Sequence, residues 1–233
     1  MHENELIPLN KFSYYFIKSL EFYSLKKDVV AKFSFLLNLL CIFCAFLIPD
    51  GLTVWQINTI YLVLFIIISF SSSMYLFACI KELRGKEYTF LSCVKRISRR
   101  LFLVAFSSLL FTIASIIGMI VLLLPGIYFM STYFLYNCYI VDLGENYEDS
   151  NDASRRLTKP YREILNKYFL YFILSAGGTG YFFVTMMATS GNKLIVISAI
   201  SFFIAFAILV YQRFIAYLYM DIEYKRNILK HKS

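Results

Sequence analysis

Residues 101–124 read LFLVAFSSLLFTIASIIGMIVLLL, and residues 125–142 continue PGIYFMSTYFLYNCYIVD. The first run contains no charged residue, and it exceeds the roughly 20 apolar residues with which a helix crosses the hydrocarbon core of a bilayer. A helix of a soluble bundle would carry a polar face, which this run lacks. The second run begins with Pro125-Gly126, a turn signal. We therefore predict spans over residues 101–124 and 127–142, joined by a turn at this Pro-Gly pair. The second run is short for a full crossing, so either it extends past Asp142 or the Pro-Gly turn lies inside the membrane.

Four further apolar runs extend this pattern along the chain. Of its 233 residues, 59% are hydrophobic and 16% are charged, whereas soluble domains are nearer half apolar and a quarter charged. Disorder is excluded by the same composition, and five cysteines are too few and odd in number for a secreted disulfide scaffold. The predicted fold class is all-α, a polytopic protein of six transmembrane helices in a single integral membrane domain over residues 1–233. The predicted spans are residues 29–48, 54–80, 101–124, 127–142, 168–189 and 194–220.

The basic residues fix the predicted orientation of these spans. Every Lys and Arg except Lys193 falls at the chain ends or in the segments that follow the second and fourth spans. Because positively charged segments stay in the cytoplasm, both termini are predicted to be cytoplasmic, in a protein of the bacterial plasma membrane. The net charge of +8 then faces the inner leaflet. We expect anionic membrane lipid to be a partner and expect no nucleic-acid binding.

Charged segments with helical periodicity precede each pair of spans. They predict amphipathic helices that lie in the headgroup layer, near residues 11–26, 88–100 and 149–159. In the first, Phe12, Phe16, Leu20 and Tyr23 repeat at intervals of three or four residues. Basic residues of the other two are predicted to contact the lipid surface. They are Lys95, Arg96, Arg99, Arg100, Arg155, Arg156 and Lys159.

Groups suited to catalysis are scarce. The two histidines, His2 and His231, lie at the chain ends, and the spans carry no acidic residue away from their ends. Catalysis needs titratable or nucleophilic groups held together, and proton relays need acids within the membrane. We therefore expect no catalytic residue, no metal site and no cofactor, and we expect that the protein is not an enzyme.

A few polar or small residues within the spans are candidates for a polar interior. The fourth span is rich in hydroxyl and amide groups, including Tyr136 and Asn137. Ser72 lies in a run of serines in the second span, and Gly178 in a glycine-rich part of the fifth. Such residues either pack helices closely and bond between them or line a polar path. The sequence leaves both possibilities open.

Two stretches resemble a known family. Leu-Leu-Pro-Gly-Ile-Tyr at residues 123–128 and Ser-Arg-Arg-Leu-Thr-Lys at residues 154–159 resemble the membrane domain of glycerophosphoryl diester phosphodiesterases and related six-helix membrane proteins. The chain departs from that pattern at Ser150, where the group often has Ala, and at Pro160, where it often has Gly. The matching positions are Pro125, Gly126, Asp142, Ser154, Leu157, Thr158 and Lys159.

The resemblance implies a six-helix, all-α fold. It does not imply phosphodiesterase activity, which in that family resides in a separate soluble barrel for which this chain has no room. Some similar small membrane proteins occur beside systems for peptide export or immunity. We therefore expect a non-enzymatic accessory membrane protein that protects against membrane-active peptides, helps an exporter complex, or associates with lipids. The alternative is a small transporter or channel.

Overall fold

The computed structural model describes residues 8–21, 29–49, 51–121, 123–188 and 192–232, and over these residues all regular structure is helical. This agrees with the predicted all-α class. The elements are α1 (Phe12–Leu20), α2 (Val29–Phe46), α3 (Val54–Leu83), α4 (Phe90–Ser98), α5 (Leu101–Val121), α6 (Leu123–Tyr133), α7 (Tyr136–Asp142), α8 (Tyr147–Thr158), the 3-10 turn η2 (Lys159–Tyr161), α9 (Arg162–Ala188) and α10 (Lys193–Lys232).

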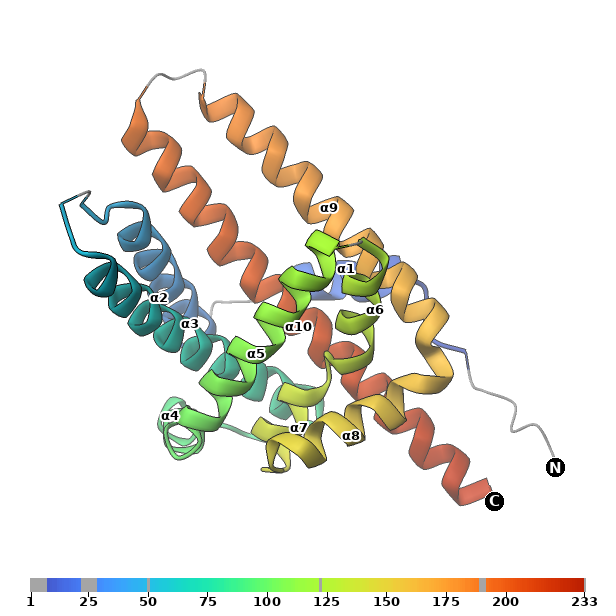
Figure 1. The fold of residues 1–233 in the computed structure, drawn as a ribbon. Coiled ribbons are helices and arrows are strands. Elements are labelled where there is room, and N and C mark those ends of the chain that lie inside the picture. The colour runs from blue at the N-terminus through green and yellow to red at the C-terminus, as the bar shows by residue number, and fades with distance from the viewer. Residues whose placement is uncertain (1–7, 22–28, 50, 122, 189–191, 233) are drawn as a thin grey trace.

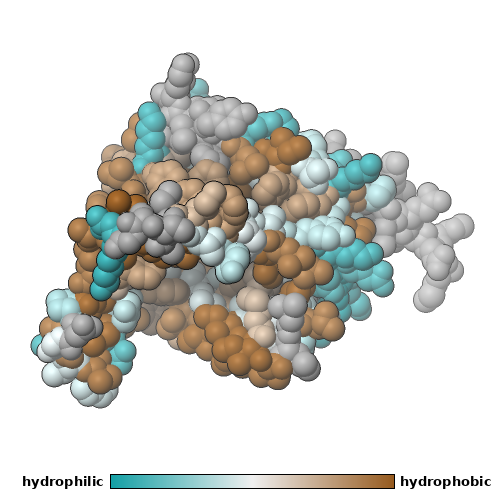
Figure 2. Space-filling view, turned by 90° about the horizontal axis from the view of Figure 1, so that it is seen from above, coloured by the Kyte–Doolittle hydropathy of each residue, from teal (hydrophilic) through white to brown (hydrophobic). Residues whose placement is uncertain are grey.

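Five helical stretches are long and apolar enough to cross a membrane. They are Val29–Phe46, Val54–Leu83, Leu101–Val121, Tyr147–Met186 and Lys193–Glu223. Their length and composition make the chain a helical integral membrane protein with several spans. Side chains such as Trp55, Phe102 and Tyr181 are largely exposed, and hydrophobic residues cover much of the face in Figure 2. Apolar surface of this extent is typical of a protein that meets lipid.

The fourth predicted span is not one helix. Residues 127–142 are divided between α6 and α7, with a break at Phe134 and Leu135. At 1.5 Å per residue, the 11 residues of α6 extend only about 16 Å. The Pro125-Gly126 pair also lies elsewhere than predicted, within the first turn of α6 rather than between two helices. A proline is accommodated there because the first N–H groups of a helix have no partner within that helix.

The long helices form antiparallel pairs. In Figure 1 the adjoining ends of α2 and α3, and of α9 and α10, lie toward the upper left, while α4, α7 and α8 lie along the bottom. The segments predicted to be cytoplasmic between spans, such as α4 and α8, therefore share one end of the molecule. The third pair, α5 and α6, packs with its backbones in close contact. A Cβ atom on Gly126 would lie 2.7 Å from the Met119 nitrogen, and one on Gly118 would lie 2.8 Å from the Gly126 Cα atom.

Helices occupy part of each segment predicted to lie in the headgroup layer. In the first, α1 ends at Leu20, and residues 22–26 lie outside the described residues. The rings of Phe12 and Phe16 pack against aromatic residues of α9 and α10, among them Phe172 and Phe214. The described part of the apolar stripe of α1 is thus half-buried against protein. The face of α4 that carries Cys93 and Ile97 is buried.

Candidate intramembrane polar site

Helix α7 is short and buried along its whole length. All seven of its residues, from Tyr136 to Asp142, are buried. The amide side chain of Asn137 lies in its first turn and the carboxylate of Asp142 at its last residue, so it carries polar groups at both ends. Two groups of polar contacts form around these ends, and together they make up the candidate site.

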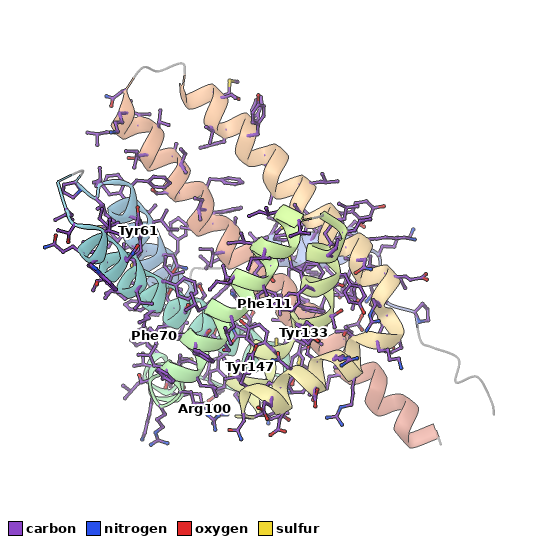
Figure 3. All side chains as sticks on the ribbon, viewed as in Figure 1. Tyr61, Phe70, Arg100, Phe111, Tyr133 and Tyr147 are labelled. Carbon is purple, nitrogen blue, oxygen red and sulfur yellow. The ribbon has the colours of Figure 1, made fainter. Side chains whose placement is uncertain are left out.

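The first group surrounds a cavity of about 190 Å³ between α3, α5, α7 and α10. Its polar lining consists of hydroxyl and amide side chains, and none of the lining residues is charged. The polar residues are Ser69, Ser72, Ser73, Ser108, Thr112, Tyr136, Asn137, Tyr211 and Gln212. Ser69 and Ser108 lie in the interior of α3 and α5 rather than at their ends. The cavity therefore lies within helices that are long and apolar enough to cross a membrane, close to Phe111, which Figure 3 labels at the centre of the bundle.

Four of the atoms in this lining have no hydrogen-bond partner among the described residues. They are the hydroxyl oxygens of Ser72 and Tyr211 and the amide oxygens of Asn137 and Gln212. A buried polar atom without a partner costs about 1–3 kcal/mol, so native proteins nearly always pair such atoms with protein or with ordered water. Four of them around one cavity could therefore each accept or donate a hydrogen bond to a polar molecule bound there.

The other polar atoms of α7 bond to neighbouring helices. The Asn137 amide nitrogen donates to the Ser73 hydroxyl at 3.1 Å, which links α7 to α3. The Tyr136 hydroxyl donates to the Ser108 hydroxyl at 3.4 Å, which links α7 to α5. Asn137 thus makes an interhelical hydrogen bond with one end of its amide and lines the cavity with the other. The structure therefore gives Asn137 the interhelical hydrogen bond and also a place in the cavity lining.

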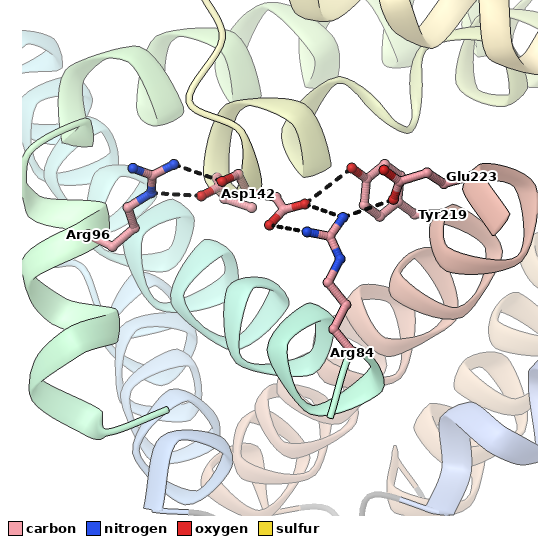
Figure 4. A network of polar contacts seen from close by, with 6 residues as sticks. Arg84, Arg96, Asp142, Tyr219 and Glu223 are labelled. Carbon is pink, nitrogen blue, oxygen red and sulfur yellow. Dashed lines mark hydrogen bonds and ion pairs between the residues drawn. The ribbon is translucent and has the colours of Figure 1, made fainter. Parts of the chain in front are cut away.

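The second group is an ionic network at the other end of α7, drawn in Figure 4. The carboxylate of Asp142, whose side chain is only 2% exposed, lies 2.6 Å from an Arg84 guanidinium nitrogen. It also accepts a hydrogen bond of 3.2 Å from the Tyr219 hydroxyl. Arg84 forms a second ion pair of 2.9 Å with Glu223. Burial alone lowers the pKa of Arg84, but the charges of Asp142 and Glu223 outweigh it, so that its pKa is raised. The network joins α3, α7 and α10.

Arg96, on α4, bonds to the same end of α7. Its guanidinium donates to the carbonyl oxygens of Val141 at 3.0 Å and of Asp142 at 2.8 Å. These carbonyls belong to the last turn of α7, where a helix has unpaired oxygens and a negative dipole. Gly144 permits this approach, because a Cβ atom there would lie 3.1 Å from an Arg96 nitrogen and 2.7 Å from an Arg100 nitrogen. The sequence predicts that Arg96 contacts the lipid surface. In the structure it also donates hydrogen bonds to the last carbonyls of α7.

The break between α6 and α7 is stabilised from α8. The Thr132 carbonyl, in the last turn of α6, accepts a hydrogen bond of 2.9 Å from Ser154. It also lies 3.0 Å from the Thr158 hydroxyl, whose one proton it shares with the Ser154 carbonyl at 2.9 Å. The last four carbonyls of a helix have no partner within that helix, so these hydroxyls replace the continuation of α6. Leu157 lies between them and is buried in the core. Three positions of the Ser-x-x-Leu-Thr-Lys motif therefore have a direct structural role, while Lys159 is exposed.

We expect the combined substitutions Ser154→Ala and Thr158→Val to lower the free energy of unfolding by about 1–3 kcal/mol, because the buried Thr132 carbonyl loses both donors. Unfolding of the purified protein by sodium dodecyl sulfate, followed by circular dichroism, measures this change. Ser150→Ala is the matched control on the same helix. The Ser150 hydroxyl donates only to the Asn146 carbonyl one turn earlier. Equal losses for the two variants would show that the bonds to Thr132 contribute nothing specific.

The remaining predicted residues lie apart from the cavity. Gly178 faces open space on α9, with nothing within 4 Å of a Cβ built on it. The structure therefore brings Ser72, Tyr136 and Asn137 together and leaves Gly178 elsewhere. Among the basic residues predicted to contact the lipid surface, Arg96 and Arg100 are half-buried, and the exposed ones are Lys95, Arg99, Arg155, Arg156 and Lys159.

Sequence reasoning missed several residues of the site. Tyr211 and Gln212 line the cavity, and Arg84, Tyr219 and Glu223 form the ionic network with Asp142. The spacing of polar residues along α10 could have indicated three of them. Gln212 and Tyr219 are seven residues apart and Glu223 follows four later, so the three lie along one face of a helix. No family model, curated protein or solved structure matches the chain.

Proposed function

We propose that this membrane protein binds a small, neutral, polar solute in the cavity around Asn137 and conducts it across the bilayer, as a small transporter or channel. The observation that carries this proposal is the convergence of four unpartnered polar atoms on one cavity in the spanning part of the bundle. Intramembrane polar groups are costly and mark substrate pathways in many membrane proteins.

The chemistry of the lining supports a neutral solute. Its groups are hydroxyls and amides, which both donate and accept hydrogen bonds. A charged solute would need a compensating charge in this low-dielectric position, and no lining residue provides one. The volume of 190 Å³ corresponds to about six water molecules at their liquid density. A short polyol or a small amide such as urea matches both the size and the hydrogen-bonding capacity.

The interrupted helix also supports the proposal. Non-helical backbone at membrane depth is tolerated where it is buried in protein or lines a cavity, and discontinuous helices form the binding sites of many transporters. Here the break between α6 and α7 lies at Phe134 and Leu135. Phe134 itself lines the cavity, as do Tyr136 and Asn137 immediately after it.

Solute flux into proteoliposomes tests this proposal. We expect liposomes that contain the protein to re-swell faster than empty liposomes after an osmotic shock with glycerol or urea, measured by stopped-flow light scattering. Asn137→Leu removes one of the cavity's polar groups and fills part of its volume. It should return the rate to near that of empty liposomes.

Asn38→Leu is the matched control. Asn38 is also a buried asparagine in a spanning helix and accepts a hydrogen bond from Ser71, but it does not line the cavity. Its substitution should leave the flux per folded protein unchanged. If the wild-type protein passes water, glycerol and urea no faster than empty liposomes do, the conduction proposal is wrong.

The predicted orientation and the predicted accessory role remain proposals of their own. The basic segments around α4 and α8 lie at one end of the molecule, which supports placing that end and both termini in the cytoplasm. A role in peptide immunity or export is drawn from the family resemblance and needs a partner, either a membrane-active peptide or an exporter complex.

A further inference from the structure

The elbow between α4 and α5 contains a second concave site, separate from the cavity. It is a surface hollow of about 920 Å³ whose lining includes four basic residues and no acidic residue. The four are Lys95, Arg96, Arg99 and Arg100. Figure 3 labels Arg100 at the lower end of α5, where the spanning helix meets the segment before it. The hollow therefore lies where the headgroups of one leaflet would be.

Two of the four basic side chains are held in place by the protein. Arg96 bonds to the last carbonyls of α7, and Arg100 donates to the Glu145 carbonyl at 3.4 Å. Burial and the neighbouring charge of Arg100 both lower the pKa of Arg96. The positive charges of Arg96 and Arg100 are thus fixed near each other with little freedom to separate, and an anion bound between them would relieve their repulsion.

The other two basic side chains point outward and remain available. Lys95 and Arg99 are exposed, and neither forms an ion pair with another residue in the described part of the chain. The hollow thus combines two fixed guanidinium groups with two free cationic groups. Arginine and lysine side chains bind the oxygens of a phosphate through short, charge-assisted hydrogen bonds.

Helix α5 adds backbone donors and an apolar wall. Its first three residues, Leu101, Phe102 and Leu103, line the hollow. The N–H groups at the start of a helix have no partner within that helix, and the helix dipole there favours an anion. Phe102 is 84% exposed and stacks on Phe106, with ring centroids 6.1 Å apart. These rings extend from the basic hollow along the membrane-facing side of α5.

We propose that the α4–α5 hollow is a binding site for the phosphate headgroup of an anionic phospholipid, whose acyl chain lies along Phe102 and Phe106. The four cationic side chains and the helix N-terminus would bind a phosphate, and the adjoining aromatic surface would contact a hydrocarbon chain. A phospholipid supplies both. A free phosphate would satisfy the first two features and leave the rings uncovered, which is why the site is assigned to a lipid. This inference is independent of solute conduction through the cavity.

Lipid retention tests the site. The full-length protein is purified from a mixture of phosphatidylglycerol and phosphatidylcholine, and bound lipid is counted by native mass spectrometry. We expect the wild type to retain phosphatidylglycerol selectively. The double variant Lys95→Gln/Arg99→Gln should bind it about 30-fold more weakly, since each basic residue near an anionic surface contributes about 1 kcal/mol. Both side chains are exposed, so the fold should be retained, which circular dichroism checks.

The matched control is Arg155→Gln/Arg156→Gln. It removes the same charge from an exposed pair on α8 and leaves the hollow intact. Selective loss in the first variant alone supports the site. Equal losses in both would show general attraction to the surface and overturn it, as would equal retention of phosphatidylcholine. Displacement of the lipid by millimolar inorganic phosphate would assign the hollow to a free anion and also overturn the proposal.

Discussion

Replacing Arg84 by alanine is expected to lower the free energy of unfolding by about 3–5 kcal/mol. The substitution removes the ion-pair partner of the Asp142 carboxylate, which is 2% exposed. Removing one partner of a buried ion pair costs this much because the remaining charge stays buried and unpaired. The Tyr219 hydroxyl still donates to Asp142 but carries no charge. Unfolding in sodium dodecyl sulfate, followed by circular dichroism, measures the loss.

Two comparison variants separate the ion pair from a general effect of charge. Lys86→Ala removes an exposed positive charge two residues away and should change the stability by less than about 0.5 kcal/mol. The double variant Arg84→Met/Asp142→Leu removes both charges, and it should be more stable than Arg84→Ala alone. If Arg84→Ala and Lys86→Ala unfold at the same detergent fraction, Asp142 does not depend on Arg84.

Gly126→Ala should destabilise the protein by about 3 kcal/mol or more. A Cβ at this position would lie 2.7 Å from the Met119 nitrogen and 3.0 Å from the Gly118 carbonyl carbon, and both atoms belong to the backbone of α5. Overpacking typically costs about 1–3 kcal/mol when side chains can move aside, and a backbone yields less. Small residues allow this kind of approach between membrane helices. Thermal unfolding in detergent, followed by a thiol-reactive dye, reports the change.

The dye detects unfolding because Cys41, Cys79, Cys93 and Cys138 are buried in the folded protein. Cys44 is exposed and is replaced by alanine in the parent protein to lower the background. The matched control is Gly177→Ala, which puts the same methyl group on a helix where nothing lies within 4 Å. Since alanine favours a helix over glycine by about 1 kcal/mol, this control should be neutral or stabilising. A Gly126→Ala protein as stable as the wild type would refute the close contact.

The spanning helices could be predicted because each depends on its own residues. An uncharged run such as residues 101–124 is costly to place anywhere except in a membrane or a protein core, whatever its neighbours are. Helices α2, α3, α5, α9 and α10 accordingly lie over the predicted runs, with differences at their ends. The start of α6 was mispredicted at Pro125, because the sequence does not distinguish a proline in the first turn of a helix from a proline in the turn before it.

The division of the fourth span could not be predicted, because it depends on tertiary contacts. Ser154 and Thr158, which stabilise the break, lie 22 and 26 residues beyond Thr132. The sequence of residues 127–142 gives no sign of these contacts. The partners of Asp142 are likewise distant in sequence. Asn137 was identified because an amide is conspicuous among apolar residues, whereas Tyr211 was not, because tyrosine is common in these helices and near membrane interfaces.

The uncharged lining of the cavity has an energetic consequence for the proposed transport. A membrane potential does about 2.3 kcal/mol of work on each elementary charge per 100 mV, and it does none on a neutral solute in a neutral site. With no acidic or basic side chain among the lining residues, passage through this cavity would couple neither to voltage nor to a proton gradient at the site itself. At this site a neutral solute would move down its own concentration gradient, so the solute concentrations on the two sides of the membrane would set the direction of net flow.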